Sequence, residues 1–164
     1  MSHRANRSAA THRNASHCIT ISALPNNGSQ GINALELAME ASAVVQRRFY
    51  EDFPAHELEK KYNFLSCSTM KPTQIKVPKG GLNQLPPNCT ISGDIRLTPF
   101  YDLTKVRARV EEYVAEMNAD IDGVATRGPM SKYTLPEEAG GNVGKLEIKW
   151  GDTAMSGIAC KLDR

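Results

Sequence analysis

Two charged residues, Asp94 and Arg96, stand two positions apart in the segment CTISGDIRL, residues 89–97. The segment alternates small or apolar residues with polar ones, as a half-buried β-strand does. Strand side chains alternate between the two faces of a sheet, so both charges are expected on one polar face. That face either meets a ligand or faces solvent. In the second case the two residues form a surface ion pair that contributes little stability.

The motifs of self-contained catalytic sites are missing from the sequence. The four histidines occur in neither an HxD nor an HExxH pattern, and no GxSxG nucleophile motif or Walker phosphate loop is present. The Gly80-Gly81 pair reads as a turn, because a phosphate cradle needs more glycines at a defined spacing. We therefore expect no catalytic residue and no metal ligand in this chain.

Length and composition indicate one ordinary globular domain. The chain has 164 residues, 40% of them hydrophobic, and a formal net charge of +2, which is too small to indicate nucleic-acid binding. No apolar run reaches membrane-spanning length, which predicts a soluble protein. Four scattered cysteines without a CxxC pair predict reduced, buried thiols in an intracellular protein. They are Cys18, Cys67, Cys89 and Cys160.

The first residues differ in composition from the rest. Residues 1–14 combine arginine with serine, alanine and asparagine, and no acidic residue occurs before Glu36. This composition fits an organelle-targeting peptide, a disordered tail or a wrongly assigned gene start. We expect the folded domain over residues 15–164.

Two helices and four strands follow from hydrophobic periodicity. Residues 17–25 alternate as a strand. Residues 32–53 have helical spacing, with Asn33 as N-cap and Glu36, Glu40, Arg47 and Arg48 opposite the apolar stripe. Residues 66–78 form a second strand, in which Pro72 indicates an edge position or a bulge. Residues 89–97 are the third strand. Asp102 caps a helix over residues 103–122, and residues 145–150 are the fourth strand, with an extended pattern continuing through Ile158, Cys160 and Leu162.

The order β-α-β-β-α-β predicts an α+β two-layer sandwich of the ferredoxin-like type, with two helices on one face of a four-stranded antiparallel sheet. RNA-binding modules share this order, but they need aromatic residues on the central strands, and residues 89–97 have none. An open sheet leaves edges, so an edge strand or helix could pair with a second copy. The residues alone therefore favour an accessory or interaction domain.

Several segments resemble the M20 metallopeptidase and amidohydrolase family, and within it the acetylornithine deacetylases of plant type. They are GINALELAME, RRFYEDFP, SCSTMKPTQ, GGLNQLPPNCTISGDIRLTPFYD and TRGPMSKYTLPEE. The resemblance covers residues 31–163 and is confined to the inserted lid, or dimerisation, domain. It implies that the complete enzyme is a zinc-dependent deacetylase of N-acyl amino acids in arginine biosynthesis. The zinc ligands would lie outside this chain, which alone would be inactive.

The resemblance also implies partners and a compartment. We expect a homodimer, or pairing with a full-length family member, and a small N-acyl amino acid as the complete enzyme's substrate. Neither nucleic acid nor membrane is expected as a partner. The cytoplasm is the expected location, with an organelle as the alternative. A non-catalytic homodimerisation or protein-interaction module is the second hypothesis.

Asn83 and Arg96 match the family residues that hold the substrate's carboxylate or polarised carbonyl, in some members across the dimer interface. A guanidinium group suits a planar carboxylate, and an asparagine can donate to an oxyanion without bringing a charge. Asn83 could instead bond its own backbone as a turn residue. The chain departs from the family at Ile21, where the family carries a catalytic histidine, and His17 is not placed equivalently.

Overall fold

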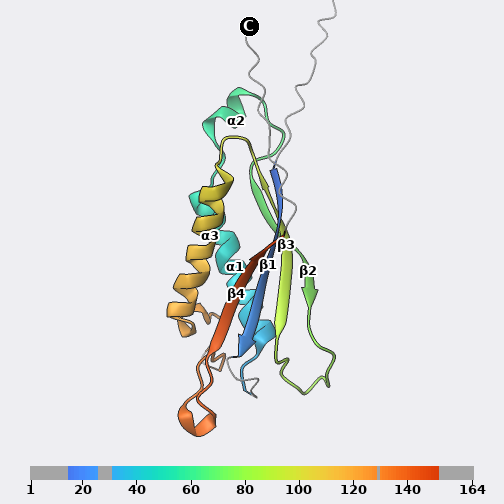
Figure 1. Cartoon of the computed structure of the whole chain (residues 1–164), viewed down its shortest axis with the longest axis vertical. Coiled ribbons are helices and arrows are strands. Elements are labelled where there is room, and N and C mark those ends of the chain that lie inside the picture. Colours follow the sequence, from blue (N-terminus) through green and yellow to red (C-terminus); the bar gives the residue numbers. More distant parts are fainter. Residues whose placement is uncertain (1–14, 26–30, 129, 152–164) are drawn as a thin grey trace, which may run out of the picture.

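The computed structural model describes residues 15–25, 31–128 and 130–151, which form two layers (Figure 1). One layer is an antiparallel sheet with the strand order β2-β3-β1-β4. Helices α1 and α3 pack on one face of it and leave the other open. The predicted α+β sandwich is confirmed. The strands are β1 (Ala15–Pro25), β2 (Thr69–Lys76), β3 (Cys89–Leu97) and β4 (Gly144–Trp150), and the long helices are α1 (Ala34–Asp52) and α3 (Leu103–Ala119).

The two central strands show the alternation that the sequence predicts. In β3 the odd-numbered positions, such as Ile91 and Ile95, are buried beneath the helices, and the even-numbered positions face outward. On the open face, hydroxyl groups of β1 and β3 pair across the strands, with Thr20 Oγ1 3.1 Å from Ser92 Oγ. The sheet thus buries an apolar core on one side and presents a polar surface on the other.

Both predicted helix caps are present. The Asn33 side chain accepts from the backbone N–H groups of Leu35 and Glu36, and the Asp102 side chain accepts from those of Thr104 and Lys105. Such caps satisfy donors that the first helical turn leaves free.

The prediction for Glu40 is wrong, because this residue is buried on α1. One carboxyl oxygen accepts from the Thr126 N–H at 2.8 Å, and the other forms an ion pair with Arg127 Nε at 3.2 Å. A helical pattern scored by polarity alone assigns glutamate to the solvent face. Here the segment that follows α3 supplies a donor and a charge.

β2 is an edge strand, and its pairing with β3 shifts register between Pro72 and Gln74, so both predictions made for Pro72 are confirmed. A Cβ on Gly93 would lie 2.5 Å from the Lys71 carbonyl oxygen. Glycine is therefore needed at that position, because the irregular strand approaches it closely.

Three short helices of the described chain were not predicted. They are α2 (Glu57–Lys61) and the 3₁₀ helices η1 (Asp122–Val124) and η2 (Glu137–Ala139). The long helix α3 ends at Ala119, three residues earlier than predicted.

Cys18 and Cys67 are free and exposed, whereas Cys89 is buried, so the expectation of buried thiols is wrong for two of these three. Residues 1–14 and the expected strand residues Ile158, Cys160 and Leu162 lie outside the described residues. No described helix is long and apolar enough to cross a membrane.

The sheet has two distinct ends. β1 begins opposite Leu97 of β3, and the N–H of Gly151, which follows β4, donates to the Cys18 carbonyl. The described chain therefore enters and leaves the sheet at the same end, called here the Arg96 end. The 77–88 connection between β2 and β3 lies at the opposite end, called the Asn83 end (Figure 1).

Candidate functional site

Arg96 lies on the open face of the sheet, one residue before the end of β3. Its Nε donates to Asp94 Oδ2 at 2.7 Å, and its side chain is 64% exposed. Asp94 thus fixes one edge of the guanidinium group, and the terminal nitrogens remain able to bind an anion from outside. The two residues that period two places together do contact each other. The ion pair adds little stability at this exposure.

The strand neighbours of this pair are shorter residues. Thr69 of β2 pairs with Arg96 in the strand register, and Cys18 of β1 pairs with Asp94. The arginine is therefore longer than the described side chains at these paired positions.

Asn83 lies in a turn of the 77–88 connection and is exposed. The connection makes few bonds of its own, with the Gly81 N–H donating to Gln84 Oε1 and the Gln84 N–H to the Gly81 carbonyl. In one copy of the chain Asn83 is thus exposed at the tip of the domain, with its Oδ1 close to Gly81 of the same turn.

One copy of the domain does not bring Asn83 and Arg96 together. The span from Cys89 to Arg96 is about 24 Å at 3.4 Å per strand residue. The connection that carries Asn83 lies beyond Cys89, projecting away from the strands (Figure 1). This separation exceeds the length of a small N-acyl amino acid.

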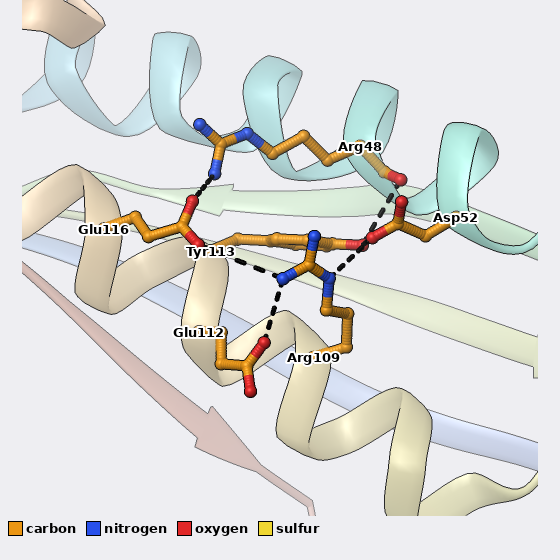
Figure 2. Close-up of polar contacts among 6 residues, drawn as sticks. All are labelled: Arg48, Asp52, Arg109, Glu112, Tyr113 and Glu116. Carbon is orange, nitrogen blue, oxygen red and sulfur yellow. Dashed lines mark hydrogen bonds and ion pairs between the residues drawn. The ribbon is translucent and has the colours of Figure 1, made fainter.

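The densest cluster of charges joins the two long helices (Figure 2). Arg109 of α3 donates to Asp52 at the end of α1 at 2.7 Å and to Glu112 at 2.9 Å. Arg48 pairs with Glu116 at 2.5 Å. The cluster therefore consists of alternating charges that fix α1 against α3.

Tyr113 lies at the centre of this cluster and is fully buried. Its hydroxyl donates to Asp52 Oδ2 at 2.5 Å, and the guanidinium groups of Arg48 and Arg109 lie 5.7 and 5.0 Å from its ring centroid. Burial, followed by the hydrogen bond to Asp52, raises the pKa of Tyr113, while the bonds from Tyr113 and Arg109 lower the pKa of Asp52. Every charge in the cluster is used internally, so its role is to position the helices.

His17 and Ile21 both point into the core from β1. Burial lowers the pKa of His17, and Nε2 has no hydrogen-bond partner among the described residues. Ile21, at the position where the family resemblance leads us to expect a histidine, packs beneath the helices with 5% of its surface exposed. Neither residue reaches the open face that carries Arg96.

Within residues 15–25, 31–128 and 130–151, no group of three or more His, Cys, Asp or Glu side chains is arranged to hold a metal ion. The described residues therefore do not fit a zinc site.

A family model described as the peptidase dimerisation domain, M20_dimer, matches residues 12–122. The chain belongs to this family. The M20 resemblance found in the sequence motifs is confirmed, and the dimerisation domain contains both candidate site residues, Asn83 and Arg96.

The dimerisation domain is similar in sequence to two curated acetylornithine deacetylases. It is 52% identical over 135 residues to the one from Arabidopsis thaliana, covering 82% of this chain and 30% of that protein. It is 48% identical over 134 residues to the one from Dictyostelium discoideum, covering 80% of this chain and 30% of that protein. The chain thus spans less than a third of the length of these relatives.

Solved structures of low sequence identity share the fold. An amidase of the hydantoinase/carbamoylase family from Burkholderia phymatum gives a TM-score of 0.61 at 10% identity, over 93% of this chain and 31% of that one. An amidase of the same family from Burkholderia ambifaria gives 0.55 at 12% identity, over 91% and 30%. The aminobenzoyl-glutamate utilization protein from Klebsiella pneumoniae gives 0.53 at 15% identity, over 89% and 30%.

Sequence reasoning missed the tertiary polar contacts. Tyr113 was not assigned to the apolar stripe of α3, and nothing marked Asp52 as its partner. A second buried carboxyl, Glu59 of α2, binds the Thr98 hydroxyl at 2.7 Å and also escaped notice. The one available signal was an aromatic residue at position 113, three residues after buried Val110 and thus close to the apolar face.

Proposed function

We propose that this chain is the lid and dimerisation part of a metal-dependent deacetylase of N-acyl amino acids, of the acetylornithine deacetylase type. The observation that carries the proposal is the 52% identity to the Arabidopsis enzyme over 82% of the chain. Identity at this level, extending through the Asn83 and Arg96 segments, supports a shared substrate class. The catalytic domain with its zinc ions, and a place in arginine biosynthesis, belong to the complete enzyme.

The second copy is expected to pair along β2. This edge strand is exposed from Lys71 onward, with Ile75 53% exposed. Tyr50 and Met39 extend the apolar surface on α1, and the Tyr50 hydroxyl donates to the Met70 carbonyl of β2. The backbone of Met70 is bonded by Tyr50 and Gln46, so a second strand would add to the exposed part of β2 beyond Met70, and a two-fold axis would join two sheets into one.

The opposite edge suits pairing less well. β4 alternates Lys145 and Lys149 with its apolar residues, and Trp150 is already engaged by Glu111 and Arg107 of α3. Lysine on an edge strand opposes the addition of another strand, but it does not separate the two edges, because β2 carries Lys71 and Lys76. The difference that favours β2 is that its apolar Ile75 is exposed, whereas Trp150 of β4 is already covered by α3.

One site assembled from two subunits follows from the separation of Asn83 and Arg96. Arg96 would bind the substrate carboxylate in its own subunit, with Asp94 holding the guanidinium group in place. Asn83 would reach the partner's site from the exposed tip and donate to the developing oxyanion. The exposure of Asn83 and its distance from Arg96 support this arrangement.

A chimaera of the Arabidopsis acetylornithine deacetylase tests the proposal. Residues 31–151 of this chain replace the matching segment of the Arabidopsis enzyme. The host keeps its own residues before the first helix, including the one at the position of Ile21. The chimaera should hydrolyse N-acetylornithine. R96A should raise KM by roughly 30-fold. This corresponds to a loss of ~2 kcal/mol in binding free energy, the lower end of the cost of removing one partner of a charge pair that is buried in a complex.

The matched control is K145A, which removes another exposed cation of the sheet and should leave KM unchanged. A folded chimaera without hydrolysis, or an R96A variant with the KM of the parent, would contradict the proposal. The compartment, cytoplasm or organelle, is tested separately by imaging the 164-residue chain fused to a fluorescent protein at its C-terminus.

A further inference from the structure

Aromatic side chains gather at the Arg96 end, where α2 and the connection from β3 to α3 meet. The His56 ring stacks on Phe100 at 5.1 Å, and Phe64 meets the same ring edge-on at 5.3 Å. Tyr62 also stacks on Phe100, at a centroid distance of 6.1 Å. This aromatic cap consists of Phe53, His56, Tyr62, Phe64, Phe100 and Tyr101.

Two apolar or aromatic side chains beside or within the cap are exposed. Leu65 is fully exposed, and Tyr62 is 48% exposed. A single exposed leucine is ordinary, but Leu65 directly follows Phe64 of the aromatic cap, so both exposed side chains lie on one short segment. Aromatic residues of this kind are enriched at the centres of protein interfaces.

Buried polar contacts hold the segment under the cap in one conformation. The Thr98 hydroxyl donates to Glu59 Oε1 at 2.7 Å, and the Thr98 N–H donates to Ser68 Oγ at 3.1 Å. His56 caps α2, its Nδ1 accepting from the Leu58 N–H. The surface is therefore preformed, which lowers the entropic cost of docking.

The cap lies where the described chain enters and leaves the sheet. Phe100 follows the end of β3, which pairs with the beginning of β1, and the loop with Leu65 leads into β2 at Thr69. Gly151 leaves beside Cys18 on the same end. A domain whose two ends lie together can be inserted into a larger one and faces it with that end.

We propose that Tyr62 and Leu65 are the anchors by which this domain docks onto the catalytic domain of the same polypeptide. The inference rests on the proposed function. This chain covers 30% of each curated relative, and the catalytic domain would lie in the roughly 70% that it does not cover. Lys60 and Lys61 are exposed next to the anchors. The surface that receives them is therefore an apolar pocket with acidic residues at its rim.

Hydrogen exchange provides the test, with the 164-residue chain and the chimaera compared under identical conditions. The backbone amides of residues 60–66 and 98–101 should exchange about tenfold more slowly, or slower still, in the chimaera, because docking closes this end to solvent. Y62S/L65S should abolish that protection in the chimaera. In the 164-residue chain it should lower the melting temperature only by the loss of the Tyr62–Phe100 stacking, while L65S, at a fully exposed side chain, should change neither exchange nor melting temperature.

L82S/L85S is the matched control, because it removes two exposed leucines from the Asn83 end. It should leave the protection of residues 60–66 intact. Three results would each overturn the inference. Residues 60–66 could exchange equally in the chain and the chimaera, the grafted domain could show a melting transition separate from that of the host, or the protection could survive Y62S/L65S. Hydrolysis of N-acetylornithine is scored separately, so failure of the proposed function is distinguishable from failure of docking.

Discussion

The two connections of β2 lie at opposite ends of the sheet and are built differently. Residues 53–68, at the Arg96 end, contain a helix, stacked rings and the buried Glu59–Thr98 contact. Residues 77–88, at the Asn83 end, are exposed at nearly every position, with Leu82 fully so. The first connection is fixed by its own chain, whereas the second has little to pack against within one copy.

This difference separates the two candidate site residues. Arg96 lies on a central strand and is bonded to the carboxylate of Asp94 on the same strand, so its position is determined within the domain. Asn83 lies on an exposed turn, so a second protein surface is needed to fix it. A dimer that places this turn against the partner's site would supply that surface.

The largest effect on stability is expected from T98V, at the well-packed connection. Valine removes the hydroxyl that donates to Glu59, whose other carboxyl oxygen is already without a partner among the described residues. A buried carboxyl left unbonded should lower the free energy of unfolding by about 2–3 kcal/mol. Urea denaturation of the 164-residue chain measures it, and a loss under 0.5 kcal/mol would show that this connection is not fixed as described.

I75D should weaken self-association by roughly 30-fold, the effect of losing about 2 kcal/mol at an interface centre. The aspartate places a charge on the exposed β2 edge, next to apolar residues of α1. Sedimentation equilibrium of the 164-residue chain measures the dissociation constant, with L65D as control at the other end. Equal weakening by both variants would contradict pairing along β2.

D52N should flatten the acid side of the pH–stability profile. The pKa of Asp52 lies below its unfolded value of 3.8 because Tyr113 and Arg109 bond to the charged carboxylate. Its contribution is complete above that value and disappears as the pH falls through the folded pKa. Thermal melts over this range should therefore show a smaller loss for D52N than for the parent, and parallel profiles would count against the helix cluster.

The smallest effect is expected from Q84A in the exposed connection. Its side chain accepts only from the Gly81 N–H at an exposed site, so the free energy of unfolding should fall by under about 0.5 kcal/mol. The urea experiment used for T98V provides the comparison. A loss as large as that of T98V would remove the distinction between the two connections.

Most of the fold could be predicted because it depends on local periodicity. The alternation in residues 89–97, the caps Asn33 and Asp102 and the irregularity at Pro72 each report a short-range rule that the structure confirms. Buried Glu40, Glu59 and Tyr113 could not be predicted, because their partners are distant in sequence. The pairing of Asp94 with Arg96 followed from period two, and the separation of Asn83 from Arg96 follows from the length of the predicted strand between them.

Mixed dimers of the chimaera test most directly whether one site takes Arg96 from one subunit and Asn83 from the other. N83A and R96A chimaeras, each weakly active alone, are co-expressed in equal amounts. Half of the dimers are then mixed, and one of the two sites in each is intact, so about a quarter of the parent activity should return. As control, the parent mixed with the N83A/R96A double variant should also retain about a quarter. No recovery in the first mixture, with about half of the parent activity in the second, would place both residues in one subunit and contradict the account.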